Sequence, residues 1–122
     1  MEFSKPGTER PGRLVDLRRN PRFSLDAEVR ISSHSAGSLA GRVLDISEGG
    51  LAAIVKMEVP LNEVVGLEFT LLEGEVEVEA LVRQRNAFRY GFQFVEQGPA
   101  RELIARACRR LAVERTLAKI VE

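Results

Sequence analysis

The chain has 122 residues, enough for one domain, and its 44% hydrophobic and 30% charged residues are typical of a soluble globular protein. Its 18 basic and 18 acidic side chains cancel, so it lacks the broad basic face that binding to bulk DNA or RNA requires. No apolar run approaches the roughly 18 residues of a membrane-spanning helix, and we therefore expect no membrane insertion.

Cysteine and histidine each occur once, which limits the chemistry that the chain can perform. The single cysteine, Cys108, excludes a disulfide within the chain, and we expect a cytoplasmic protein. A catalytic thiol would need a histidine partner, but His34 lies far from Cys108 in the sequence. With no nucleophile–base pair and no metal-ligating cluster in the pattern, we expect neither an enzyme nor a cofactor.

The amino-terminal part shows no periodicity, and strand patterns follow it. Residues 1–16 combine prolines, glycines and scattered charge, which predicts a flexible arm. Apolar and polar side chains then alternate over residues 23–32, which predicts a strand with one buried face. Five further strands are expected over residues 39–46, 51–55, 64–72, 76–82 and 88–94. The last of them carries four aromatic rings on one face: Phe88, Tyr90, Phe92 and Phe94.

After residue 97 the apolar spacing becomes helical. It predicts a helix over about residues 99–120, with Pro99 in its first turn and Cys108 as a small core residue on its apolar stripe. The stripe continues in the sequence through Leu117 and Ile120. Six short strands followed by one helix favour a small barrel that the helix closes or plugs. We therefore expect an arm, residues 1–16, and one domain, residues 17–122.

Two polar motifs lie around the first two strands. The first, Arg18-Arg19-Asn20-Pro21-Arg22, precedes the first strand, and its proline disfavours a helix, so we expect a loop. A guanidinium group binds phosphate oxygens or the O6/N7 edge of guanine through two hydrogen bonds, and it also stacks on bases. An arginine cluster in a neutral chain favours a small anionic ligand.

The second motif, Asp45-Ile46-Ser47-Glu48-Gly49-Gly50, connects the second and third strands. Asp45 can accept hydrogen bonds from the N1 and N2 donors of guanine, and Ser47 offers a hydroxyl group to a base or phosphate. Gly49 and Gly50 allow positive φ in a tight turn, and Gly50 also lets backbone approach a ligand closely. Alone, such a motif is also a good hairpin turn, and an arginine pair alone is often a solvated charge cluster.

Together the two motifs resemble those of the PilZ domain family, the bacterial receptor module for the second messenger cyclic di-GMP. Its members carry the motif RxxxR before a six-stranded antiparallel β-barrel. A second motif, [D/N]xSxxG, follows shortly after the first. The resemblance covers roughly residues 17–112. It implies an all-β fold with a C-terminal helix and the ligand-binding residues Arg18, Arg22, Asp45, Ser47 and Gly50. Arg19 and Gly49 lie inside the motifs, and Arg83 either points into the site or is a surface residue of its strand.

These expectations favour a receptor that binds cyclic di-GMP, orders its arginine loop and presents a changed surface to an unidentified effector protein. Position 17 holds leucine, not a further arginine, so we expect one nucleotide per chain. An alternative is an adaptor barrel whose arginines bind an acidic protein partner without nucleotide. A single-stranded nucleic-acid module is disfavoured, because it needs exposed aromatic side chains in a basic groove.

Overall fold

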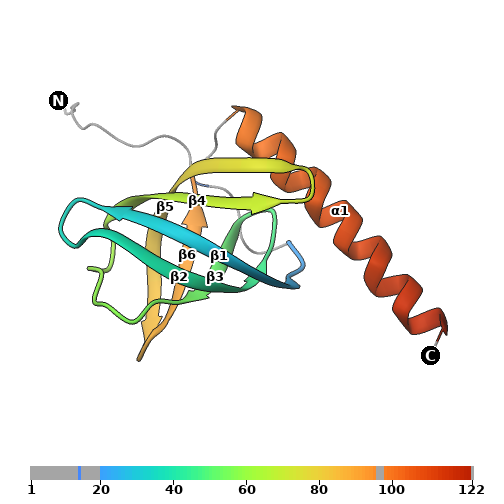
Figure 1. The fold of residues 1–122 in the computed structure, drawn as a ribbon, viewed down its shortest axis with the longest axis horizontal. Coiled ribbons are helices and arrows are strands. Elements are labelled where there is room, and N and C mark those ends of the chain that lie inside the picture. Colours follow the sequence, from blue (N-terminus) through green and yellow to red (C-terminus); the bar gives the residue numbers. More distant parts are fainter. Residues whose placement is uncertain (1–13, 15–19, 96–97, 122) are drawn as a thin grey trace, which may run out of the picture.

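The computed structural model describes residue 14 and residues 20–95 and 98–121, with six strands followed by one helix (Figure 1). The elements are β1 (Phe23–Ser33), β2 (Gly37–Ile46), β3 (Gly50–Ile54), β4 (Val64–Leu71), β5 (Gly74–Asn86), β6 (Arg89–Phe94) and α1 (Gly98–Val121). The arm expected over residues 1–16 lies outside the described residues except for Leu14, which forms an isolated antiparallel bridge with Val95. The division into arm and domain therefore stays a prediction.

The strands close into an antiparallel barrel in the order β1-β2-β3-β6-β5-β4, which confirms the expected fold. Each half of the barrel is a three-stranded meander, β1–β2–β3 or β4–β5–β6, in which neighbours in sequence pair with each other. Two seams join the meanders. The β3–β6 seam runs from Gly50↔Gln93 to Ile54↔Arg89, whereas the β1–β4 seam extends only from Arg30↔Glu68 to Ser32↔Gly66.

The barrel interior is filled by the apolar side chains of the alternating patterns. Its largest fully buried members include Tyr90, Phe94, Ile31, Ile46, Leu51 and Leu67. Burying one such side chain contributes about 1.5–3 kcal/mol relative to leaving it in water. The burial of the alternating apolar side chains is therefore the main source of barrel stability. The outward positions of the same strands carry the polar residues.

The expectation of four aromatic rings on one buried face is wrong for Phe88. β6 begins at Arg89, and Phe88 lies in the preceding turn with 55% of its surface exposed. Ala87, in the same turn, has a φ of 57°, and this left-handed backbone reverses the chain before the alternation resumes. The Phe88 carbonyl still accepts a hydrogen bond from the Val55 amide at 2.9 Å.

Helix α1 begins at Gly98 with Pro99 in its first turn, as expected, and packs against the barrel through its first half. Cys108 is buried there, and burial raises the pKa of its thiol to about 11, so the thiol is protonated at neutral pH. Arg110 donates hydrogen bonds of 2.7 and 3.2 Å to Glu73 in the turn between β4 and β5. This ion pair ties the helix to the β4–β5 hairpin.

The C-terminal end of α1, past Arg115, extends beyond the barrel (Figure 1). Leu117 and Ile120 continue the apolar stripe in sequence, but they are 54% and 71% exposed, so the stripe is packed only up to the point where the helix leaves the barrel. No helix in the described part of the chain is long and apolar enough to cross a membrane.

Candidate functional site

A cavity of about 710 Å³ lies over the outer face of the β3–β6 seam. Four of its lining side chains are arginines: Arg22, Arg83, Arg85 and Arg89. Among the described residues no acidic side chain lines it. The cavity therefore has the charge and the size class of a site for a small anionic ligand.

The strand register builds a floor with almost no side chains beneath this cavity. Asp45 of β2 pairs with Ala52 of β3, Ala52 pairs with Gly91 of β6, and Gly91 pairs with Gln84 of β5. With strands spaced about 4.8 Å apart, this row spans roughly 14 Å from Asp45 to Gln84. Because Ala52 and Gly91 carry at most a methyl group, no long side chain rises from the floor between the two ends of the row.

A β-bulge stands at each end of this row. The β2–β3 register shifts between Val43 and Asp45, and the β5–β6 register shifts between Val82 and Gln84. The extra residue in β5 is Arg83, which is exposed and lines the cavity. Bulges change the direction of the side chains that follow them and are frequent beside functional sites. The side chains at both ends of the row therefore depart from the regular alternation of their strands.

Asp45 joins the two sequence motifs. Its Oδ1 accepts a hydrogen bond from Arg22 Nε at 2.8 Å, and its Oδ2 lies 3.6 Å from Arg89 Nη2. The Asp45 side chain is 20% exposed, whereas the Arg22 and Arg89 side chains are 43% and 55% exposed. The carboxylate thus accepts a hydrogen bond from Arg22 and lies near Arg89, and both arginines line the cavity.

Ser47, Gly49 and Gly50 of the second motif are buried where the chain turns from β2 into β3, whereas Glu48 is exposed. The Ser47 hydroxyl accepts hydrogen bonds from the Gly49 and Gly50 amides, both at 3.1 Å, and contacts the Gly50 carbonyl oxygen at 3.3 Å. None of these three residues lines the arginine cavity. In the described part of the chain, the hydrogen bonds among these three residues stabilise the turn.

The expected positive φ at Gly49 and Gly50 is wrong, since the described glycines with positive φ are Gly37 and Gly74. Gly50 is required for a different reason. A Cβ at this position would collide with the carbonyl oxygen of Phe92 on β6. The glycine therefore allows two strands of the barrel to approach each other at the end of the β3–β6 seam.

Arg22 also contacts the C-terminal helix. Arg115 of α1 donates a hydrogen bond to the Arg22 carbonyl oxygen at 3.2 Å, and its guanidinium carbon lies 4.5 Å from the centroid of the Phe23 ring. The helix is thereby connected to the segment that carries the last arginine of the first motif. Arg18 and Arg19 lie outside the described residues.

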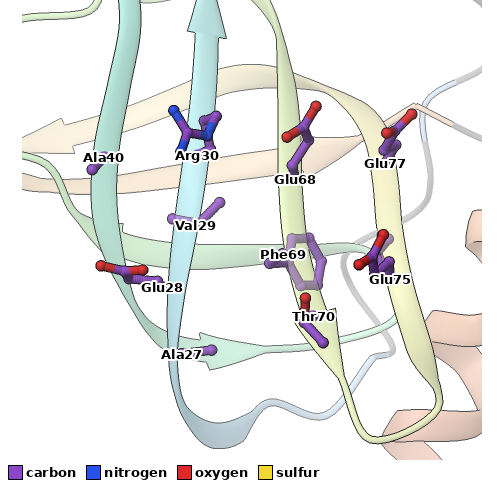
Figure 2. A pocket seen from close by; sticks show the side chains of 11 residues that line it. Ala27, Glu28, Val29, Arg30, Ala40, Glu68, Phe69, Thr70, Glu75 and Glu77 are labelled. Carbon is purple, nitrogen blue, oxygen red and sulfur yellow. The ribbon is translucent and has the colours of Figure 1, made fainter.

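A second cavity, of about 570 Å³, opens where the β1–β4 ladder ends (Figure 2). It is lined by four glutamates: Glu28, Glu68, Glu75 and Glu77. Figure 2 shows Glu68 and Glu77 at the same level on neighbouring strands, as their direct pairing requires, with Arg30 across the seam. This cavity repels anions, and nowhere in residues 20–95 and 98–121 do His, Cys, Asp or Glu form a group that could hold a metal ion.

Arg89 and the β5–β6 hairpin belong to neither sequence motif and were not predicted as part of the site. Arg89 alternates with the inward-facing Tyr90, so its outward direction is readable from the sequence. Its approach to Asp45 depends on the pairing of β3 with β6, which the alternation does not reveal. Arg83 was expected either in the site or on the surface, and it lines the cavity.

The PilZ domain family matches residues 16–110 of this chain. The PilZ domain of YcgR from Escherichia coli, solved with c-di-GMP, superposes with a TM-score of 0.66 at 16% identity, covering 85% of this chain and 98% of that one. The PilZ domain of CeSA from a cellulose-synthesizing bacterium gives 0.61 at 19% identity, covering 75% and 98%.

The complex of K. pneumonia MrkH with c-di-GMP gives a TM-score of 0.71 at 20% identity. It covers 85% of this chain, which spans 56% of the MrkH chain. Identities at this level show a common fold. No curated protein sequence matches significantly.

Proposed function

Because this chain belongs to the PilZ domain family, we propose that it binds cyclic di-GMP in the arginine-lined cavity over the β3–β6 seam. The observation that carries the proposal is the 2.8 Å ion pair between Arg22 and Asp45, since it joins the two motifs at the edge of that cavity. Similar folds solved with c-di-GMP support the choice of ligand.

The chemistry of the cavity matches the chemistry of this ligand. Cyclic di-GMP carries two phosphates and two guanines, and guanidinium groups bind both phosphate oxygens and the O6/N7 edge of guanine. Arg22 and Arg83 supply such groups, and Arg18 and Arg19 add to them by their place in the first motif. Asp45 accepts from the N1 and N2 donors of guanine, which gives the site a preference for guanine over adenine.

Ser47, Gly49 and Gly50 serve the site by shaping the turn that follows Asp45. Their hydrogen bonds fix the backbone at the end of β2, and Gly50 keeps β3 close to β6. In the free protein the Asp45 carboxylate accepts a hydrogen bond from Arg22. A ligand that donates to Asp45 must therefore replace this hydrogen bond or share the carboxylate with Arg22. This exchange lowers the net gain on binding, because one charged hydrogen bond is replaced by another.

We further propose that binding is passed to α1. A change in the position of Arg22 alters the carbonyl that Arg115 holds and the Phe23 ring on which Arg115 stacks. The exposed apolar residues of the outer half of α1, including Leu117, then offer a surface to an effector protein. Hydrogen exchange should show protection gained around residues 13–24 and a change in the second half of α1, with little change in the barrel strands.

Isothermal titration of the chain with cyclic di-GMP, cyclic di-AMP and GTP tests the proposed ligand. We expect cyclic di-GMP to bind in a ratio near one. Arg22→Ala should weaken binding by about ten- to a hundredfold, since a hydrogen bond to a charged group contributes about 1.5–3 kcal/mol. Arg30→Ala removes the same charge beside the acidic cavity and should change affinity little.

If the wild-type chain binds none of the three nucleotides, the proposed function is wrong, and an adaptor that binds an acidic protein through its arginines replaces it. If Arg22→Ala binds as the wild type does, cyclic di-GMP occupies another surface. Both variants change exposed residues, so a circular dichroism spectrum like that of the wild type is expected and serves as the folding control.

A further inference from the structure

Arg89 belongs to neither sequence motif, but it stands at the edge of the floor formed by Ala52 and Gly91. It is two residues before Gly91 on β6, so both point to the outer face of the sheet about 7 Å apart. It lines the same cavity as Arg22, and its side chain is 55% exposed. A ligand lying on the floor therefore meets the Arg89 guanidinium.

Arg89 lies farther from the nearest carboxylate than Arg85 and Arg22 do. Arg85 donates a 2.9 Å hydrogen bond to Glu58, and Arg22 donates one of 2.8 Å to Asp45. Arg89 approaches Asp45 only to 3.6 Å, which exceeds hydrogen-bond distance. The carboxylate is already held by Arg22, so holding Asp45 does not require Arg89.

We propose that Arg89 contacts the bound nucleotide directly, and that Arg89 with the Ala52–Gly91 floor receives the second of its two guanines. This inference rests on the proposed function and adds to it a half-site outside both motifs. The Asp45 carboxylate reads the donor edge of one guanine. The planar fork of Arg89 suits the O6/N7 acceptor edge of the other, which adenine does not present in the same form.

A double-mutant cycle separates direct contact from an effect exerted through Asp45. Cyclic di-GMP is titrated calorimetrically into the full chain as wild type, Arg89→Ala, Asp45→Ala and the double variant. We expect Arg89→Ala to weaken binding about tenfold or more in both backgrounds, because it removes a charged hydrogen bond to the ligand itself. Arg42→Ala is the matched control, since Arg42 lies on the same outer face but is held by Asp26 at 2.7 Å.

Gly91→Val tests the floor without touching Asp45, and so decides the matter even where Asp45→Ala binds too weakly for titration. A Cβ at position 91 meets Gln84 at 3.5 Å, an ordinary contact, so the variant should fold. We expect its affinity for cyclic di-GMP to fall about tenfold or more, because the added side chain occupies the floor.

Three results would overturn the inference. The first is an Arg89→Ala affinity within about twofold of the wild type or of Arg42→Ala. The second is a loss that disappears in the Asp45→Ala background, which would make Arg89 a positioning residue for Asp45. The third is a Gly91→Val variant that binds normally. In each case the wild type still binds, so the proposed function stands, whereas a wild type that does not bind removes both.

Discussion

Replacing Gly50 with alanine adds one methyl group where β3 lies against β6. A Cβ at this position collides with the Phe92 carbonyl oxygen and lies 3.1 Å from the carbonyl carbon and 3.3 Å from Gln93 Cα. All three are backbone atoms, which cannot rotate away as the end of a flexible side chain can. The strands must therefore separate at this end of the β3–β6 seam.

The cost follows from the contacts that such a separation strains. Gly50 pairs with Gln93 in the ladder, and the Phe94 amide donates a 2.8 Å hydrogen bond to the Gly49 carbonyl. Overpacking a core costs about 1–3 kcal/mol, and each buried backbone hydrogen bond lost adds about 1 kcal/mol. We expect the free energy of unfolding to fall by about 3 kcal/mol or more, out of the roughly 5–15 kcal/mol of a typical domain.

Urea denaturation followed by circular dichroism measures this loss, and Gly66→Ala is the matched control. A Cβ at Gly66 meets only Ser32 Cβ at 3.6 Å, and alanine is favoured over glycine within a strand by about 0.5–1 kcal/mol. Gly66→Ala should therefore be as stable as the wild type or slightly more stable. A Gly50→Ala protein with the wild-type midpoint and slope would refute the packing argument.

Two further predictions concern the core and the helix. Tyr90→Phe should lower the free energy of unfolding by about 1–3 kcal/mol, because the Tyr90 hydroxyl accepts from the buried Val59 amide and donates to the Met57 carbonyl, each at 3.0 Å; unchanged stability in urea contradicts this. The hydrogen bond from Arg110 holds the pKa of Glu73 below its ordinary 4.5, although burial raises it. The stabilisation by this ion pair is therefore complete above pH 4.5 and is lost as the pH falls through the folded-state pKa of Glu73. Between about pH 6 and about pH 3, the wild type should therefore lose more stability than Glu73→Gln. Equal losses would refute the role of the pair.

The barrel was predictable because its strands carry one-sided patterns and their neighbours in sequence pair with each other. The same rule failed at the turn before β6, where Phe88 fits the alternation and yet lies outside the strand. Ala87 adopts a positive φ there, and nothing about an alanine in a sequence signals that conformation. β5 also runs on to Asn86, past the end expected for it, because its polar outer part has no burial pattern to mark a boundary.

The candidate site was only half predictable, for a physical reason. Arg22 and Asp45 belong to motifs that can be recognised by spacing, and a 2.8 Å ion pair joins them. Arg89 reaches Asp45 through the pairing of β3 with β6, and register between strands distant in sequence is set by packing and by bulges. The bulge at Arg83 further shifts which side chains of β5 face outward, and alternation alone does not reveal it.

The two-meander plan of the barrel has a consequence for the order of events in folding. Each meander consists of hairpins that are local in sequence, whereas the β3–β6 seam joins strands that are distant in sequence, so we expect the seam to form last. Because the cavity takes Arg22 from one half and Arg89 from the other, neither half alone contains it. A ligand bound in this cavity would contact both halves of the barrel, so it can bind only after the β3–β6 seam has formed. We therefore expect such a ligand to slow the opening of the barrel and to leave the rate of its assembly unchanged.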